Sequence, residues 1–319
     1  MIAISRVLSF FLAIVLSGCI SINLPSVQPL AEKVVAGEGK AKILLVDISG
    51  IIKDEESANV LGLQGSPNLT ARVREELDLA SKDDAVKAVV LRINTPGGSV
   101  TTSDIISHEI ESFKKKRKVP VVAELMDVAA SGGYYIASSA DRIIAHPTTV
   151  TGSIGVIAIS VSASGLMEKI GITNQTIKSG PLKDIGSPLK TMTEEERRIL
   201  QSVIDGMYDR FIDRVMTGRP DSFTLDELRK IADGRVYTAS QARDLKLIDS
   251  IGYLDDAIDW AKQASGVKEA RVVTYAQPRA YRNNIYSRAE SAPSGINLIN
   301  IDAGIPKSSG MEFMYIWLP

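Results

Sequence analysis

The sequence has few of the residues that build disulfides, metal sites and histidine-based catalytic centres. Its 319 residues include one cysteine and two histidines, and the formal net charge is -1. A single cysteine excludes an internal disulfide framework, and no CxxC, HExxH or clustered His/Cys pattern offers metal ligands. The balanced charge gives no sign of binding to nucleic acid. We therefore expect no metal, no cofactor and no nucleic-acid partner.

The N-terminus also lacks an apolar run long enough to span a bilayer, which takes ~20 residues. One basic residue precedes a short apolar stretch over residues 7–16, the pattern of a secretory signal. The stretch ends in the letters LSGC, which resemble a bacterial lipobox, and the chain's only cysteine is the last of them. We expect residues 1–18 to be a lipoprotein signal peptide, Cys19 to be lipidated, and residues 19–40 to form a tether. An ordinary signal anchor is the alternative.

The remaining chain alternates apolar strands with helices. β-branched, apolar runs at residues 42–49, 88–94 and 119–125 are typical of buried parallel strands. Helical spacing at residues 69–81 and 101–118 separates them, which predicts an α/β fold with a mostly parallel sheet. We also expect the following smaller elements: a helix at 131–140, strands at 142–146 and 175–178, an extended run at 154–160, and a helix at 165–170.

The C-terminal part is predicted to be helical. Thr193 and Glu196 have the spacing of a capping box, and a long apolar-faced helix follows them. Shorter helices and a last strand are expected after it, at 225–232, 239–245, 254–265 and 271–275. The folded domain is expected to cover residues 41–277, with an extension over 278–319.

Two glycine-rich motifs follow predicted strands. In TPGGS, Gly97 and Gly98 open a helix, where backbone amides are free and a substrate carbonyl can approach closely. In AASGGYY, Ser131 begins a helix and Gly132 leaves its hydroxyl uncrowded. Both strand ends should meet at the carboxyl edge of the sheet, where open α/β folds bind ligands. These motifs predict a serine nucleophile with the amide of Gly132 as an oxyanion donor and further free amides at the Gly97-Gly98 turn.

A serine nucleophile needs a base, and the sequence favours a lysine. Neither His108 nor His146 has a convincing Asp partner for a catalytic triad. Lys183 lies in a loop of glycine and proline in the letters KSGPLKD, and Lys178 in the same motif is its rival. Burial can lower the pKa of a lysine so that it accepts a proton. Ser153 in TGSIG is expected to orient the lysine amine, although it could itself be a competing nucleophile.

These motifs, in this order, resemble the signal peptide peptidase A family of serine proteases. The resemblance covers residues 42–275 and the short form of the family, with one catalytic copy and both dyad residues from one chain. It implies a ClpP/crotonase-like spiral α/β fold, with Ser131 as nucleophile, Lys183 as general base, Gly98 and Gly132 as oxyanion amides, and Ser153 as the hydroxyl that holds the lysine.

The resemblance also implies where the protein works and on what. It implies a ring-like homo-oligomer at the bacterial cell envelope, with its catalytic domain on the extracytoplasmic side, degrading remnant signal peptides. The lipobox cysteine replaces the family's more usual transmembrane helix, so we expect a lipid-anchored serine endopeptidase that cleaves apolar peptides. A crotonase-like enzyme acting on acyl thioesters and a non-catalytic scaffold are the alternatives.

Overall fold

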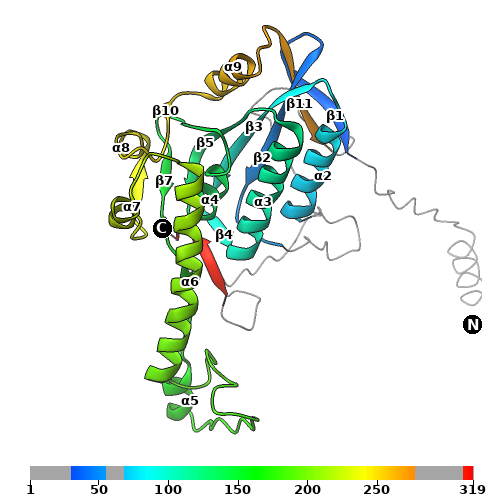
Figure 1. The fold of residues 1–319 in the computed structure, drawn as a ribbon. Helices are drawn as coiled ribbons and strands as arrows, with labels where there is room; N and C mark the ends of the chain where they lie inside the picture. Colours follow the sequence, from blue (N-terminus) through cyan, green and yellow to red (C-terminus); the bar gives the residue numbers. More distant parts are fainter. Residues whose placement is uncertain (1–29, 55–67, 277–311, 319) are drawn as a thin grey trace, which may run out of the picture.

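The computed structural model describes residues 30–54, 68–276 and 312–318. In these residues a mostly parallel sheet carries helices on both faces (Figure 1). Its strand order is β1-β11-β2-β3-β5-β6-β10, with β7 beside the end of β5 and β9 beside β7. Only the β1–β11 and β7–β9 pairs are antiparallel in this described sheet. The predicted α/β fold with a mostly parallel sheet is confirmed.

The strands of the large sheet have these bounds: β1 Ala31–Ala36, β2 Ala41–Ser49, β3 Val86–Thr95, β5 Val121–Ala130, β6 Arg142–Ala145, β7 Val150–Gly152, β9 Val236–Thr238, β10 Ser250–Ile251 and β11 Ala270–Ala276. The central strands β2, β3 and β5 are nearly all buried because helices cover both faces. Their side chains alternate between two apolar cores. In β2, for example, Leu44 and Val46 belong to the core under α2 and α3, whereas Ile43 and Leu45 belong to the core under α9.

The helices are α2 Leu69–Ser81, α3 Val100–Arg117, α4 Gly132–Ala137, α5 Ser164–Lys169, α6 Glu194–Gly218, α7 Leu225–Ile231, α8 Ala239–Asp244 and α9 Leu254–Ala264. Polar side chains cap the N-termini of several of these helices. Asn68 accepts from the amide of Ala71 at the start of α2. Thr193 and Glu196 form the predicted capping box of α6.

Two features stand outside the large sheet. A small sheet consists of β4 (Gly97–Ser99), β12 (Phe313–Ile316) and β8 (Ile157–Ala158), with β12 in the middle. Residues 159–206, which we call the arm, contain α5 and the first half of α6. Figure 1 shows the arm projecting away from the sheet, with α5 at its far end. Glu196 is the arm's only buried residue.

The structure differs from the sequence-based expectations at three places. Residues 175–178 form no strand, since this part of the arm has no neighbouring strand to pair with. Ala31–Ala36, placed in the tether by the sequence, form β1 and pair with β11. The expected extended run at residues 154–160 forms only the two-residue strand β8. The signal peptide and Cys19 lie outside the described residues.

Candidate active site

Ser131 lies between the end of β5 and the start of α4, in a backbone conformation that non-glycine residues rarely adopt. Its φ is 52° and its ψ is -114°. Backbone hydrogen bonds hold it there: its amide donates to the carbonyl of Gly152 at 2.8 Å, and its carbonyl accepts from the amide of Tyr135 at 2.8 Å. The residue is 1% exposed. Its Oγ has no hydrogen-bond partner among the described residues, so the backbone is held in place while the hydroxyl is unengaged.

The glycines predicted as oxyanion donors lie at positions that tolerate no side chain. A Cβ on Gly98 would lie 2.1 Å from the carbonyl oxygen of Ile52, and one on Gly132 would lie 2.5 Å from Ser103 Oγ. A Cβ on Gly97, whose φ is +100°, would lie 2.8 Å from the amide nitrogen of Gly132. The structure therefore brings the TPGG turn against the start of α4. Gly132 directly follows Ser131, so the TPGG turn lies close to the candidate nucleophile as well.

Ser153 is brought to the same edge of the sheet. β5 and β7 run parallel, and Ala130 pairs with Gly152. Ser131 and Ser153 directly follow these paired residues, so they leave neighbouring strands side by side. Ser153 is buried, has a φ of 50°, and its amide donates to the carbonyl of Arg235 at 2.7 Å. A polar group held in this way could orient a base that approaches Ser131.

The structure does not bring Lys183 to these residues. Lys183 is exposed and belongs to the segment between α5 and α6. Figure 1 shows that segment at the far end of the arm, away from the sheet. Its amide closes a turn onto the carbonyl of Gly180 at 3.2 Å. Within the described residues its side chain makes no hydrogen bond or ion pair. The pairing of Lys183 with Ser131 therefore stays a prediction.

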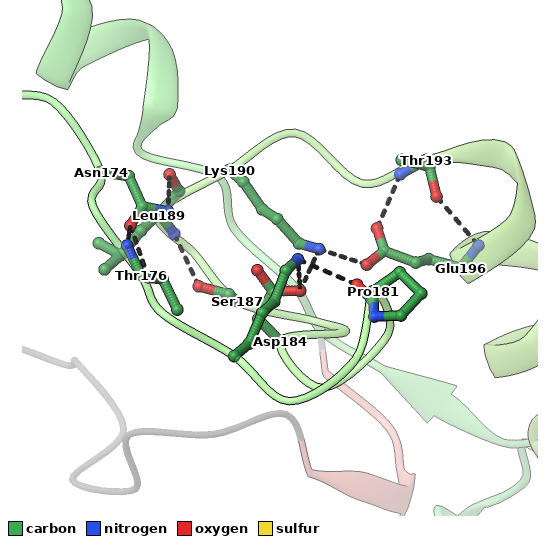
Figure 2. Close-up of polar contacts among 10 residues, drawn as sticks. Asn174, Thr176, Pro181, Asp184, Ser187, Leu189, Lys190, Thr193 and Glu196 are labelled. Carbon is green, nitrogen blue, oxygen red and sulfur yellow. Dashed lines mark hydrogen bonds and ion pairs between the residues drawn. The ribbon is translucent and has the colours of Figure 1, made fainter.

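A cluster of charged side chains fixes the loop around Lys183 but leaves Lys183 out. Asp184 Oδ1 accepts from Lys178 Nζ at 2.7 Å and from Lys190 Nζ at 2.6 Å, and Lys190 also pairs with Glu196 (Figure 2). The two lysines lower the pKa of Asp184 to about 2 by hydrogen bonding, and Asp184 raises the pKa of Lys190 in return. Lys178, the rival base, is thus engaged with a carboxylate.

Both histidines are occupied elsewhere. The ring of His146 lies edge-on to Tyr253, with 5.0 Å between ring centroids, and its Nδ1 is 2.9 Å from the hydroxyl of Thr148. His108 lies on α3, and its Nε2 is 3.4 Å from the hydroxyl of Ser112. Neither contacts Ser131 in the part of the chain that the structure describes. A Ser-His pair therefore has no support from the geometry.

Sequence reasoning missed a group of aromatic residues beside the site. The ring of Tyr315 in β12 lies 5.1 Å from that of Tyr135 in α4 and 4.7 Å from that of Phe211 in α6. Tyr135 and Phe211 also pack edge-to-face, with 5.1 Å between ring centroids. Tyr135 is in the AASGGYY motif, four residues after the nucleophile candidate. The sequence pattern of this short helix does not indicate which aromatic side chains Tyr135 contacts.

Comparison with known proteins shows the family of this chain. The profile of peptidase family S49 matches residues 113–268. The chain is 37% identical over 246 residues to a protein of Enterococcus faecium named putative signal peptide peptidase SppA, covering 76% of this chain and 70% of that protein. This chain belongs to peptidase family S49. As a member of this family, the protein is a serine-type peptidase. The parallel sheet flanked by helices confirms the predicted α/β fold class with a mostly parallel sheet.

Other relatives of this S49 peptidase match over smaller shares of their length. The putative protease MJ0651 of Methanocaldococcus jannaschii is 39% identical over 62% of this chain and 63% of its own. Protease 4 of Salmonella typhi is 35% identical over 71% of this chain, which spans about a third (35%) of that protein. Among solved structures, a variant of the 1510-N membrane-bound stomatin-specific protease aligns with a TM-score of 0.44 and 17% identity, over 70% of this chain and 85% of that one.

Proposed function

We propose that this S49 peptidase is a lipid-anchored endopeptidase that cleaves apolar peptides, such as remnant signal peptides, with a Ser131–Lys183 dyad. The observation that carries the proposal is the buried, unpartnered hydroxyl of Ser131 at the start of α4, against which the TPGG turn packs. The name of the Enterococcus faecium relative, a putative signal peptide peptidase, supports the substrate class.

In the proposed mechanism neutral Lys183 takes the proton of Ser131 Oγ while the oxygen attacks a peptide carbonyl. The negative charge that develops on the carbonyl oxygen is stabilised by the amides of Gly98 and Gly132. Lysine Nζ then returns the proton to the leaving amine, and the peptide bond breaks. Water, activated by the same lysine, hydrolyses the acyl-enzyme and restores Ser131. Ser153 orients the amine during both steps.

We further propose that the dyad forms between two copies of the chain in a ring-like homo-oligomer. In one copy, the segment between α5 and α6 that carries Lys183 lies at the far end of the arm, away from α4, which Ser131 precedes (Figure 1). A lysine base must be neutral, and burial against a neighbouring subunit would lower its pKa. Asp184 holds Lys178 and Lys190 but makes no ion pair with Lys183, so the Lys183 amine is available to a second subunit. This differs from the sequence-based expectation that one chain supplies both residues.

The surface of the arm supports assembly. Large apolar side chains stand exposed along it, including Ile177 at 98%, Val161 at 71% and Leu166 at 63%. Large apolar side chains exposed together on one segment favour a role for that segment as a contact surface. Identical subunits commonly close into rings, in which each arm would cover the next subunit's site.

Mixing two inactive variants tests the shared dyad. Chains with Ser131→Ala and chains with Lys183→Ala are co-expressed with different tags, and doubly tagged oligomers are purified and assayed on an apolar peptide. If neighbours share the site, about a quarter of the sites regain both residues, and activity returns in that proportion. A mixture as inactive as each variant alone would show that Ser131 and Lys183 act within one chain or not together at all.

The anchor is a separate part of the proposal. The lipobox predicts that Cys19 carries acyl chains and that the catalytic domain lies at the cell envelope, outside the cytoplasmic membrane. Within the described ranges, no helix combines the length and apolar character needed to cross a membrane. Mass spectrometry of the mature protein should find an acylated N-terminal Cys19, and Cys19→Ser should abolish the modification. An unmodified Cys19 with Met1 retained would contradict the lipid anchor.

A further inference from the structure

The turn that carries Gly98 is held by hydrogen bonds that engage the amides on either side of it. The amide of Gly97 donates to Thr95 Oγ1 at 3.0 Å, and the amide of Ser99 donates to the carbonyl of Ile52 at 2.8 Å. The amide of Ile52 donates in turn to the carbonyl of Gly97 at 2.8 Å, so Ile52 and Gly98 form a parallel bridge. Successive amides of an extended segment point to opposite sides. The Gly98 amide therefore points away from Ile52.

Ser103 on α3 joins this turn to the start of α4. Its Oγ donates to the carbonyl of Ser99 at 2.8 Å. The same oxygen would lie 2.5 Å from a Cβ placed on Gly132, so the hydroxyl lies against the backbone of Gly132. Ser103 is fully buried. One hydroxyl thus contacts both of the motifs that carry the proposed oxyanion amides.

Thr95 at the end of β3 makes a second link between the same two motifs. Its Oγ1 accepts from the amide of Gly97, and its methyl carbon would lie 2.8 Å from a Cβ placed on Gly133 in α4. Thr95 is also fully buried, and it pairs with Ala129 of β5. Buried side chains in a close-packed interior have little room to move. Ser103 and Thr95 therefore fix the turn relative to the start of α4.

We propose that Ser103 and Thr95 are positioning residues of the oxyanion site. They fix the Gly98 amide relative to the start of α4, which carries the second proposed donor, Gly132. The inference rests on the proposed function, in which these two amides stabilise the oxyanion. Such donors act only when they are already aimed at the developing charge, and a misplacement of about 1 Å can lower the rate ~100-fold. Because both side chains are buried, they act through the backbone amides, and their loss should lower kcat more than it weakens substrate binding.

Steady-state kinetics of variants that lack one hydroxyl test the proposal. Ser103→Ala is compared with the matched control Ser107→Ala, a buried serine one turn later on α3. The substrate is a peptide of alanine, valine and leucine that carries a fluorophore and a quencher. Ser103→Ala should lower kcat at least ~10-fold with KM within about twofold, whereas the control should keep the wild-type kcat. Equal losses in the two variants, or a change in KM alone, would overturn the proposal.

Thr95 allows the hydroxyl to be removed and restored. Thr95→Val keeps the shape of the side chain but leaves the Gly97 amide without its acceptor, so kcat should fall ~10-fold. Thr95→Ser keeps the hydroxyl and should recover most of this loss. Because both residues hold one turn, Ser103→Ala combined with Thr95→Val should cost less than the product of the single effects. Independent, multiplicative losses would contradict a shared positioning role.

Binding of a tetrahedral adduct gives a readout that a loss of stability does not change. The aldehyde of the peptide's acyl fragment forms such an adduct when Ser131 Oγ bonds to its carbonyl carbon. Its inhibition constant should rise in Ser103→Ala by the factor by which kcat/KM falls. The shape of the pH–rate profile should not change, because the base is not altered. All assays are run at a temperature at which thermal unfolding shows every variant to be folded.

The outcomes separate this inference from the proposed function. A wild-type chain that cleaves the peptide, with Ser103→Ala and Thr95→Val equal to it in kcat and in aldehyde binding, would overturn the inference and leave the proposed function standing. A wild-type chain that neither cleaves the peptide nor binds the aldehyde would overturn the proposed function, and with it the oxyanion role on which the inference rests.

Discussion

The two halves of the candidate site are built in opposite ways. Ser131 follows the end of a buried strand, every residue of α4 behind it is buried, and backbone hydrogen bonds to Gly152 and Tyr135 fix its position. Lys183 lies on an exposed arm whose loop is held by side-chain ion pairs around Asp184. Exposed ion pairs contribute little to stability because water and salt screen them. The candidate nucleophile is therefore pre-organised by the fold, whereas the candidate base is not.

This contrast has a consequence for the proposed chemistry. An oxyanion site must be rigid, since its donors act only when they are already aimed at the developing charge. A lysine base must instead be desolvated, which an arm inserted into a neighbouring subunit can achieve. If the proposed dyad is correct, an isolated chain would contain a pre-organised nucleophile and oxyanion site but no base beside them. Assembly would supply the other half.

The largest effect is expected from removing either member of the dyad. Ser131→Ala and Lys183→Ala should each lower kcat/KM on an apolar peptide by at least ~10³-fold, and the double variant should be no worse than either one. Lys178→Ala is the matched control on the arm and should retain activity. Thermal unfolding should be unchanged in all of them. Activity kept in Lys183→Ala and lost in Lys178→Ala would move the base to Lys178.

The body of the fold could be predicted from the sequence because its signals are local. The apolar run at residues 42–49 became β2, the helical spacing at 69–81 became α2, and the capping box at Thr193 began α6. The positions of Ser131 and Gly98 at strand ends follow from the same rule, since parallel strands bring their carboxyl ends to one edge. The local hydrophobic pattern was sufficient to predict the elements that pack in or against the sheet.

The arm and the aromatic group around Tyr315 could not be predicted in this way. Residues 175–178 have strand-like letters, but no neighbouring strand accepts them. Tyr315 reaches Tyr135 across most of the length of the chain, and a pairing between such distant segments leaves no periodic signal in either of them. β1 was missed for the same reason, because its partner β11 lies more than 200 residues away along the sequence.

The pH dependence of activity sharpens the contrast between body and arm. A lysine base must be deprotonated, so kcat/KM should rise with pH to a neutral-to-alkaline optimum and fall by up to ~10-fold per pH unit on the acid side. A pH–rate profile from pH 5 to 10 measures this. A profile that stays flat down to pH 5 would argue against any lysine base.

One buried acid in the body, Glu124, and one acid on the arm, Asp184, allow the two regions to be compared by their effect on stability. Glu124 in β5 is 0% exposed, both of its carboxyl oxygens lack partners in the described part of the chain, and burial raises its pKa to about 9. The folded state holds the proton of Glu124 between pH 4.5 and 9, whereas the unfolded state releases it. Folding stability is therefore expected to fall as pH rises through this window.

Replacing Glu124 with glutamine should remove that penalty. Glu124→Gln should raise the free energy of unfolding at pH 8 by on the order of 3 kcal/mol and change it little near pH 4, where both states of the wild-type chain are protonated. Urea unfolding at the two pH values measures the difference. An equal effect at both pH values would show that packing, and not ionisation, governs this position.

A smaller effect is expected at Ser153. Ser153→Ala removes the hydroxyl proposed to orient the base but leaves the nucleophile and the oxyanion amides in place, so kcat should fall by about 10-fold with KM nearly unchanged. Ser162→Ala on the arm is a matched serine control and should retain activity. Peptide mapping after reaction with a covalent serine inhibitor should find the label on Ser131. A label on Ser153 would exchange the roles of the two serines.

The smallest effect is expected from Asp184, the acid on the arm. Lys178 and Lys190 hold its pKa at about 2, so its contribution is complete above pH 3.8 and is lost only as pH falls towards 2. Asp184→Asn should leave the unfolding temperature unchanged and speed amide exchange of residues 178–190 at pH 7, since only the loop depends on these ion pairs. Glu168→Gln, an exposed acid on α5, is the control and should not change that exchange. Activity should fall no more than about twofold in Asp184→Asn, because Lys183 itself is untouched. A drop as large as that of Lys183→Ala would show that the ion pairs position the base, and that the arm is as pre-organised as the body.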